Sequence, residues 1–562
     1  MRYAETENSK ANGIVYTPCE FAKYLASNMV WHYELMGRGK IRILDPAVGD
    51  GELVLAILNE IKSVDKNIKT AVVGFETDTS IIPTTIGRIC AEHPDVQLEI
   101  RNDDFLEYMS VCGIQEEFDL IIANPPYIRT QIMGAGKAQE ISRQTGLSGR
   151  VDAYYAFLVY AGALLKPDGI AGFITSNKFM TVKSGASVRD HLFRQARILG
   201  ITDFGDTKIF EASVLPCTII FGKGNSANTD AEFISIYETN DSGPAHVADS
   251  VFDAVGAVEK EGLAQTKNGK RYFVQHGLLA ANDSGAPWRL SSKKKDSWLD
   301  NIESVTWKKF SDIGKVRVGI KTTADKVFIG PWDKEEEEPE LLRPLITHRN
   351  AGQVVSRNSA CWRVLYPHAM EDGRRVVCDL DQYPVSKKYL EKHREQLGGR
   401  KYVTDANRLW YEIWVPQNPD SWKRRKIVFR DIAEKPEFWL DESGGVVNGD
   451  CYWIEIKDDV STEELYLALA VANSRFIEQY YDSRFNNKLY SGKRRFMAQY
   501  VNEFPLPDPA SPEAQRAIGI VQDIIQNPKG DLERKMRDLD ELVGMIFNVI
   551  PKQMASLPLS VS

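Results

Sequence analysis

The chain has 562 residues, a length that predicts two to four domains. Its 43% hydrophobic and 26% charged residues are typical of a globular protein, and a formal net charge of −8 means that any surface for a polyanion must be local. The seven cysteines form no CxxC pair or Cys/His cluster, which excludes the usual zinc and disulfide patterns. A polar N-terminus unlike a signal peptide, and the lack of a bilayer-spanning apolar run, predict a cytoplasmic protein without a metal site.

The first predicted elements are a helix start and then a strand, a loop and a helix. Thr17 and Pro18 suit the N-cap and first position of a helix. Residues 41–44 predict a strand, and Asp45-Pro46-Ala47-Val48-Gly49-Asp50-Gly51 leads from it into a helix with apolar residues at helical spacing. This geometry can hold a nucleoside against backbone N–H groups. The loop is not a GxGxxG dinucleotide site, and it lacks the lysine of a P-loop.

Acidic residues follow the next two predicted strands. Residues 71–75 end in Glu76, which is placed to accept hydrogen bonds from ribose hydroxyls; taken alone, it could also be a solvated carboxylate. Residues 96–100 lead to Asp103-Asp104-Phe105, which could read an adenine amino group and cover its ring. Together these positions predict a nucleoside site.

The tetrapeptide Asn124-Pro125-Pro126-Tyr127 follows residues 118–123, whose apolar, isoleucine-rich run predicts a buried parallel strand. The two prolines stiffen the loop and leave their carbonyls free of ladder bonds. If the Asn124 side-chain oxygen and the Pro125 carbonyl accept both hydrogens of an exocyclic amine on a planar base, its lone pair can attack a methyl donor, while Tyr127 stacks on the base. Alone, the tetrapeptide could also be a turn that ends a strand.

Further strands are predicted at residues 169–174, 198–204 and 217–221, and a helix at residues 153–165. Strands that alternate with helices predict an α/β fold with a doubly wound, mostly parallel sheet. Ligands bind such sheets at the carboxyl ends of the strands, where the loops described above would meet.

Residues 13–225 resemble the catalytic domain of the DNA amino-methyltransferases that use S-adenosylmethionine. Thr17-Pro18, the loop from Asp45 to Gly51, the Asn124 tetrapeptide and a C-terminal recognition region follow the order of the γ-class, TaqI-like adenine methylases. The resemblance implies a seven-stranded methyltransferase sheet, S-adenosyl-L-methionine as cofactor and adenine N6 as target, because cytosine N4 enzymes more often carry serine and tryptophan in the tetrapeptide.

The resemblance also implies roles for single residues. Asp45 and Thr17 would hold the methionine part of the cofactor, Glu76 the ribose, and Asp104 and Phe105 the adenine. Phe179 would replace a second base-stacking aromatic that many relatives place after the fifth strand, and it could equally be core. The expected cofactor-binding residues are Tyr16, Thr17, Asp45, Pro46, Ala47, Gly49, Gly51, Glu76, Asp104, Phe105 and Asn124, and the expected catalytic residues are Asn124, Pro125, Tyr127 and Phe179.

The second half of the chain more loosely resembles the TaqI-like recognition domain over most of residues 305–510. Residues 384–435 carry thirteen Lys/Arg against seven Asp/Glu, interleaved with tryptophan, and residues 484–496 carry five basic residues and no acid. Because lysine and arginine bind phosphate, we expect DNA contacts from Lys488, Lys493, Arg494 and Arg495. A solvated face is the alternative for either cluster.

We therefore expect a methyltransferase domain at residues 1–245, a connecting segment at 246–304, an α+β target-recognition domain at 305–510 and a helical segment at 511–562. The expected function is methylation of adenine N6 in a base flipped out of double-stranded DNA, which protects the DNA from a cognate restriction endonuclease of the same system. We expect a monomer that does not bind a membrane. The alternatives are a methyltransferase acting on RNA or protein glutamine, and a recognition subunit whose catalytic half has decayed.

Overall fold

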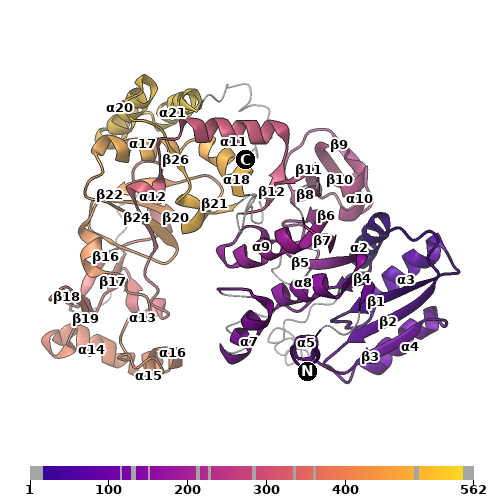
Figure 1. Cartoon of the computed structure of the whole chain (residues 1–562). Helices are drawn as coiled ribbons and strands as arrows, with labels where there is room; N and C mark the ends of the chain where they lie inside the picture. Colours follow the sequence, from indigo (N-terminus) through magenta and orange to yellow (C-terminus); the bar gives the residue numbers. More distant parts are fainter. Residues whose placement is uncertain are drawn as a thin grey trace. The chain divides into compact units, whose positions relative to one another are not determined.

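The structure is a computed structural model that describes residues 17–113, 117–127, 135–149, 152–210, 215–225, 230–280, 287–332, 337–357, 362–485 and 493–547 (Figure 1). Its contacts divide the chain into two compact units. Unit 1 contains the described residues up to Lys295, and unit 2 contains those from Asp296 onward. Each unit has its own sheet and core.

Seven strands of unit 1 lie in the order β3-β2-β1-β4-β5-β7-β6. The pairs from β3 to β5 are all parallel, and β7 is antiparallel to both of its neighbours. This order confirms the predicted doubly wound, mostly parallel α/β sheet. The strands are β1 (Lys40–Asp45), β2 (Lys69–Phe75), β3 (Gln97–Arg101), β4 (Phe118–Ala123), β5 (Leu165–Ser176), β6 (Ala196–Asp203) and β7 (Pro216–Lys223).

Helices cover both faces of this sheet because its central strands are apolar on both sides. In β4, Ile122 packs in the core that contains α2 and α3, whereas Ile121 packs in the core that contains α5, α8 and α9. The helices of unit 1 are α2 (Cys19–His32), α3 (Glu52–Val64), α4 (Ile82–Glu92), α5 (Phe105–Cys112), α7 (Ala135–Thr145), α8 (Ala153–Leu164), α9 (Ala186–Gln195) and α10 (Val251–Ala257), with 3-10 turns η1 (Asn177–Met180) and η2 (Lys183–Gly185).

The sheet continues beyond the seven expected strands. After β6 come β8 (Glu232–Glu238), β11 (Arg271–Ala280), β10 (Glu261–Thr266) and β9 (Ala245–Ala248), while β12 (Arg289–Ser291) pairs with β11. Much of the predicted connecting segment, residues 246–304, therefore belongs to the sheet of unit 1. The sequence signal for β11 is a short alternation of apolar and polar positions, because Tyr272 and Val274 are buried between more exposed neighbours.

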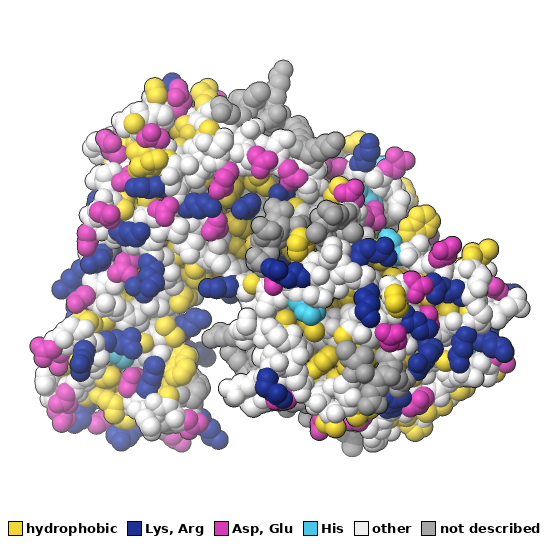
Figure 2. Space-filling model, in the orientation of Figure 1, with side chains coloured by type: hydrophobic (Ala, Val, Ile, Leu, Met, Phe, Trp, Pro, Cys, Tyr) yellow, Lys and Arg dark blue, Asp and Glu magenta, His cyan; other side chains and the backbone are white. Residues whose placement is uncertain are grey.

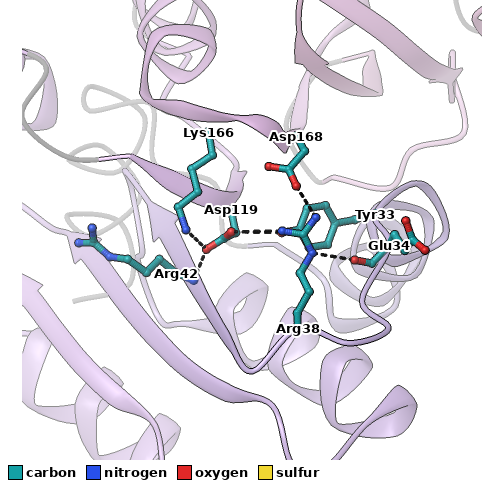
Figure 3. A network of polar contacts seen from close by, with 7 residues as sticks. All are labelled: Tyr33, Glu34, Arg38, Arg42, Asp119, Lys166 and Asp168. Atoms are coloured by element: carbon teal, nitrogen blue, oxygen red, sulfur yellow. Dashed lines mark hydrogen bonds and ion pairs between the residues drawn. The ribbon is translucent and has the colours of Figure 1, made fainter.

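A buried carboxylate, Asp119, fixes the amino end of β4 (Figure 3). It accepts hydrogen bonds from the Tyr33 hydroxyl at 3.2 Å, the Arg42 backbone N–H at 2.8 Å and the Lys166 Nζ at 2.7 Å. The Arg38 guanidinium lies 3.8 Å from the Asp119 Oδ1, the oxygen that accepts from Tyr33. These contacts join β4 to β1, to β5 and to the chain that follows α2, so one side chain sets the position of the central strand.

Replacing Asp119 by alanine should lower the free energy of unfolding by about 2 kcal/mol. Breaking a fully buried ion pair costs roughly 3–5 kcal/mol, but Lys166 and Arg38 are 34% and 27% exposed and regain water. Urea unfolding measures this change. The control is Asp168→Ala, which removes another Arg38 partner that is 61% exposed and should cost less than about 1 kcal/mol. Equal losses in the two variants would contradict this role of Asp119.

Unit 2 is built around the antiparallel sheet β14-β24-β20-β22. Alternate residues of β20 serve two cores, because Ile427 and Phe429 pack with the C-terminal helices while Val428 packs on the opposite side. The strands are β13 (Lys308–Lys309), β14 (Gly314–Val318), β15 (Ile329–Gly330), β16 (Leu342–Ile346), β17 (Arg363–Leu365), β18 (His368–Glu371), β19 (Arg374–Val377), β20 (Lys426–Arg430), β21 (Ile432–Ala433), β22 (Phe438–Asp441), β23 (Val446–Val447), β24 (Cys451–Ile456), β25 (Arg494–Arg495) and β26 (Pro505–Leu506).

The last two helices of unit 2 share a core with α17, through buried residues such as Val521 and Leu539. Within the described residues, no helix has the length and apolar character needed to cross a membrane. The helices are α11 (Lys293–Val305), α12 (Phe310–Ile313), α13 (Asp325–Phe328), α14 (Pro384–Lys392), α15 (Arg394–Gly398), α16 (Lys401–Thr404), α17 (Thr462–Ala472), α18 (Arg475–Phe485), α19 (Ala498–Val501), α20 (Pro512–Gln526) and α21 (Leu532–Ile546), with 3-10 turns η3 (His348–Asn350), η4 (Leu380–Gln382) and η5 (Pro419–Lys423).

Candidate active site

The tetrapeptide that begins at Asn124 lies directly after β4, at the carboxyl end of a strand that is buried along its whole length. β4 has parallel neighbours on both sides, β1 and β5. Pro125 is buried, while Asn124 and Tyr127 are half-buried. The strand therefore presents a rigid loop at the edge where ligands of such sheets bind.

Hydrogen bonds hold the Asn124 side chain on both sides. Its Nδ2 donates to Thr17 Oγ1 at 3.0 Å, and its Oδ1 accepts from the Tyr127 hydroxyl at 3.0 Å. Thr17 lies 107 residues earlier in the chain and just before α2. The fold thus brings together the predicted helix-start motif and the predicted catalytic loop.

The Tyr127 ring contacts aromatic residues of α8. It meets Tyr154 edge-on at a centroid distance of 5.9 Å, and Tyr154 meets Tyr155 edge-on at 4.6 Å. Burial raises the pKa of the Tyr127 phenol, so the hydroxyl keeps its proton and donates to Asn124. Sequence reasoning did not single out Tyr154, because a tyrosine in an apolar helix looks like an ordinary core residue.

The loop after β1 contains the most unusual carboxylate of the site. Asp45 is 0% exposed; its Oδ1 accepts from the Ala47 N–H at 3.0 Å, and its Oδ2 has no hydrogen-bond partner among the described residues. Burial raises the pKa of Asp45 to about 7; the charges of Glu76 and Asp50 contribute to this shift, and the hydrogen bond from Ala47 opposes it. The Asp45 Oδ2 is buried without a hydrogen-bond partner among the described residues, and a bound cation would provide that partner.

Glu76 closes the same loop from the end of β2. Its carboxylate accepts from the Gly49 N–H at 3.0 Å and from the Asp78 N–H at 2.8 Å. Gly49 and Gly51 both have positive φ, at 52° and 83°, which explains why glycine stands at these positions. Pro46 is buried beside them, and Ala47 is half-buried. The predicted cofactor residues of the two strands therefore form one connected loop region.

Asp104 and Phe105 have structural partners of their own. Asp104 is the N-cap of α5 and accepts from the Leu106 N–H at 2.9 Å. The Phe105 ring is 3% exposed and stacks on Phe157 at a centroid distance of 5.3 Å. The described structure thus uses Phe105 mainly as a core residue, while Asp104 orients the start of α5.

Phe179 is a predicted catalytic residue, and Tyr16 is a predicted cofactor-binding residue. Phe179 is 0% exposed and meets Trp288 edge-on at 5.8 Å, so its ring has no free face for a base. This corrects the expectation that Phe179 stacks on the target, because the ring belongs to the core. Tyr16 lies outside the described residues.

The predicted DNA-binding stretch is also corrected at one of its four residues, because Arg494 is buried, whereas Arg495 stays exposed. Arg494 is 5% exposed and binds both oxygens of Asp482 at 2.8 Å, with Glu478 at 3.5 Å. Arg495 binds both oxygens of Asp431, at 3.0 and 3.1 Å. These acids lie outside the acid-free stretch, so the sequence count could not reveal them.

Lys493 is exposed, and Lys488 lies outside the described residues. Figure 2 shows basic and acidic side chains interspersed over the visible surface of unit 2 rather than gathered in one basic patch. On this face, local charge alone therefore does not identify a path for DNA.

Comparisons with known proteins agree with this geometry. Residues 55–210 match the family model of the Eco57I restriction-modification methylase, and residues 352–506 match that of the TaqI-like C-terminal specificity domain. The type II methyltransferase M.BanIII of Aneurinibacillus aneurinilyticus is 36% identical over 96% of this chain and 97% of that protein. M.PaeR7I of Pseudomonas aeruginosa is 24% identical over 89% of this chain and 86% of that protein.

A solved structure shares the fold. The DrdV–DNA complex, determined by cryo-electron microscopy, has a TM-score of 0.50 at 11% identity and covers 92% of this chain, which spans 57% of the DrdV chain. The two matching family models and the identity to M.BanIII over nearly the whole length lead to one conclusion. The chain belongs to the type II DNA methyltransferases of restriction-modification systems, in the group with a TaqI-like specificity domain.

Proposed function

We propose that this chain uses S-adenosyl-L-methionine to methylate adenine N6 within a specific sequence of double-stranded DNA. The observation that carries the proposal is the hydrogen-bonded set of Thr17, Asn124 and Tyr127 at the carboxyl end of β4. Membership of the type II methyltransferases supports DNA as the substrate. A cognate restriction endonuclease of the same system and a monomeric enzyme remain part of the proposal.

Asn124 would act on the target amine. Its Oδ1 accepts a hydrogen bond from Tyr127, and an amide oxygen can accept two, so the same atom would accept a hydrogen of the amino group. The Pro125 carbonyl would accept the other hydrogen. With both hydrogens held out of the ring plane, the nitrogen lone pair is no longer delocalised into the base and can attack an electrophile.

The residues around Asp45 fit the proposed cofactor. S-adenosyl-L-methionine supplies an electrophilic methyl group when it is bound, and it carries an ammonium group. The unpartnered Asp45 Oδ2 suits that cation, since the pair would restore the charged form of a carboxyl whose pKa burial has raised. Glu76, fixed by Gly49, would accept from the ribose hydroxyls.

The target base must leave the DNA stack to reach a loop at the edge of the sheet. Tyr127, supported from one side by Tyr154, would supply the aromatic face that receives it. Holding the base by its amino group and its ring gives selectivity for a planar amine.

A transfer assay tests the proposal directly. The purified protein is incubated with methyl-labelled S-adenosyl-L-methionine and unmethylated DNA, RNA or protein in parallel, and the products are digested and separated by mass spectrometry. We expect label only in DNA and only as N6-methyladenine. Label in N4-methylcytosine would refute the base assignment, and label in RNA or in glutamine would refute the substrate.

Lys493 is an exposed residue of the basic stretch, and its contact with DNA is part of the proposal. Lys493→Ala should weaken binding to every duplex and reduce the slope of log affinity against log salt by about 0.9, because one phosphate contact is lost. Fluorescence anisotropy over a salt series measures the slope. Lys529→Ala, which removes an exposed lysine between α20 and α21, is the control and should leave the slope unchanged. An unchanged slope in Lys493→Ala would place this residue away from the DNA.

A further inference from the structure

Unit 2 contains a groove of about 570 Å³ between the segment that follows β14 and the turn that precedes β24. Eight of its eleven lining residues are polar or charged, and they include Lys321, Thr323, Lys326, Gln396, Asn448 and Asp450. These side chains offer donors, acceptors and both signs of charge within one small volume. Of the four residues expected to contact DNA, none that the structure describes lines this groove, although Gln396 belongs to the basic stretch 384–435.

Backbone contacts fix the two walls of the groove. The Ile320 N–H donates to the Val447 carbonyl at 2.8 Å, and Lys321 and Val415 exchange two backbone hydrogen bonds of 3.0 Å. Gly319 packs so closely that a Cβ there would lie 2.0 Å from the Asn448 carbonyl oxygen. The walls therefore cannot move apart without breaking several contacts.

A buried arginine, Arg400, supports the segment after β14 that forms one wall of the groove. Arg400 is 7% exposed and donates to the carbonyl oxygens of Thr322 at 2.9 Å, Trp410 at 2.7 Å and Glu412 at 3.1 Å. Thr323, the next residue of the loop, has a left-handed φ of 60°. Such a conformation is costly for a threonine and persists only where the surroundings hold it, which is often at functional sites.

We propose that this groove reads base edges of the target sequence, with Lys321 and Asn448 as specificity-determining residues. The proposal rests on the proposed function as a DNA methyltransferase. Lysine donates to guanine acceptors and asparagine can pair with adenine in the major groove. The acids Asp325 and Asp450 in the same lining would repel phosphate, so the mixed charge favours base edges over the DNA backbone.

The experiment compares Lys321→Ala and Asn448→Ala with the wild-type protein on two duplexes. One duplex carries the site found by mapping methylated positions in DNA from cells that express the protein, and the other is a scrambled duplex of equal composition. Lys315→Ala is the matched control, because this exposed lysine lies on β14 but does not line the groove. Melting temperatures show that each variant is folded.

Each groove variant should lose roughly 5- to 150-fold in affinity for the mapped site, because one base contact discriminates by about that factor. Its affinity for the scrambled duplex should change little. Sequencing should also show methylation at sites that differ from the mapped one at a single position. An unchanged ratio of the affinities for the mapped and the scrambled duplex overturns the proposal that the groove reads bases. So does an equal loss on both duplexes with a flatter salt slope, which would indicate a phosphate contact. A wild-type protein that selects neither duplex overturns the proposed function as well.

Discussion

Replacing Asn124 by alanine should lower the rate of methyl transfer by about 10²–10³-fold or more, while the affinity for S-adenosyl-L-methionine changes less than about tenfold. Loss of one preorganised acceptor for developing charge costs roughly this much in other enzymes. In the proposed mechanism the cofactor contributes the methyl group, whereas the Asn124 side chain acts on the amine, so rate and binding should separate. Single-turnover assays and calorimetric titration measure the two quantities.

Tyr127→Phe is the matched control for Asn124→Ala. It removes only the hydroxyl that donates to Asn124 Oδ1 and keeps the ring against Tyr154. A single hydrogen bond contributes about 1 kcal/mol, so the rate should fall less than about tenfold. If Asn124→Ala and Tyr127→Phe lowered the rate equally, the effect of Asn124 would come only from its hydrogen bond with Tyr127 and not from a contact with the amine. If Asn124→Ala lost cofactor affinity and rate in parallel, its assignment to the amine would be wrong.

Asp45→Asn is expected to weaken binding of S-adenosyl-L-methionine by about 10²–10³-fold. Truncating one partner of a buried charge pair costs roughly 2–5 kcal/mol, and the asparagine has the same shape without the charge. The melting temperature of the free protein should change little, because the Asp45 Oδ2 has no partner to lose among the described residues. Calorimetric titration and thermal unfolding together separate loss of the site from loss of the fold.

The affinity of the wild-type protein should also depend on pH. Because burial raises the pKa of Asp45 to about 7 in the free protein, the carboxyl is protonated below that pH. Binding of an ammonium group needs the ionised form, so binding releases a proton and the affinity should fall about tenfold per pH unit between roughly pH 7 and 5. The ammonium group stays protonated over this range.

Two controls make this pH dependence specific to Asp45. The Asp45→Asn protein should show no slope between about pH 5 and 7, since it has no carboxyl to titrate there. The ligand 5′-methylthioadenosine lacks the amino acid part of the cofactor and should bind the wild-type protein without the slope. A slope that persists with this ligand, or in the variant, would assign the titration to another group.

The sequence by itself determined the positions of the central strands and of the loop that begins at Asn124. Residues 118–123 are apolar throughout and end at Asn124-Pro125, so both the strand and its end are written in local composition. The glycines after β1 likewise predicted a loop at that position, and in the structure Gly49 and Gly51 have backbone conformations that other residues avoid. Periodicity and turn chemistry are local properties, which is why these predictions needed no tertiary contacts.

Only the tertiary structure decided which side chains are free to act. Arg494 looked available in an acid-free stretch, yet Asp482 from α18 and Glu478 neutralise it in a buried site. Phe179 looked like a base-stacking aromatic, yet Trp288 covers it. Conversely, the Asn124–Thr17 hydrogen bond spans 107 residues and could not be read from either motif alone. Burial and charge pairing depend on residues that are distant in the chain, so they follow from packing and not from local pattern.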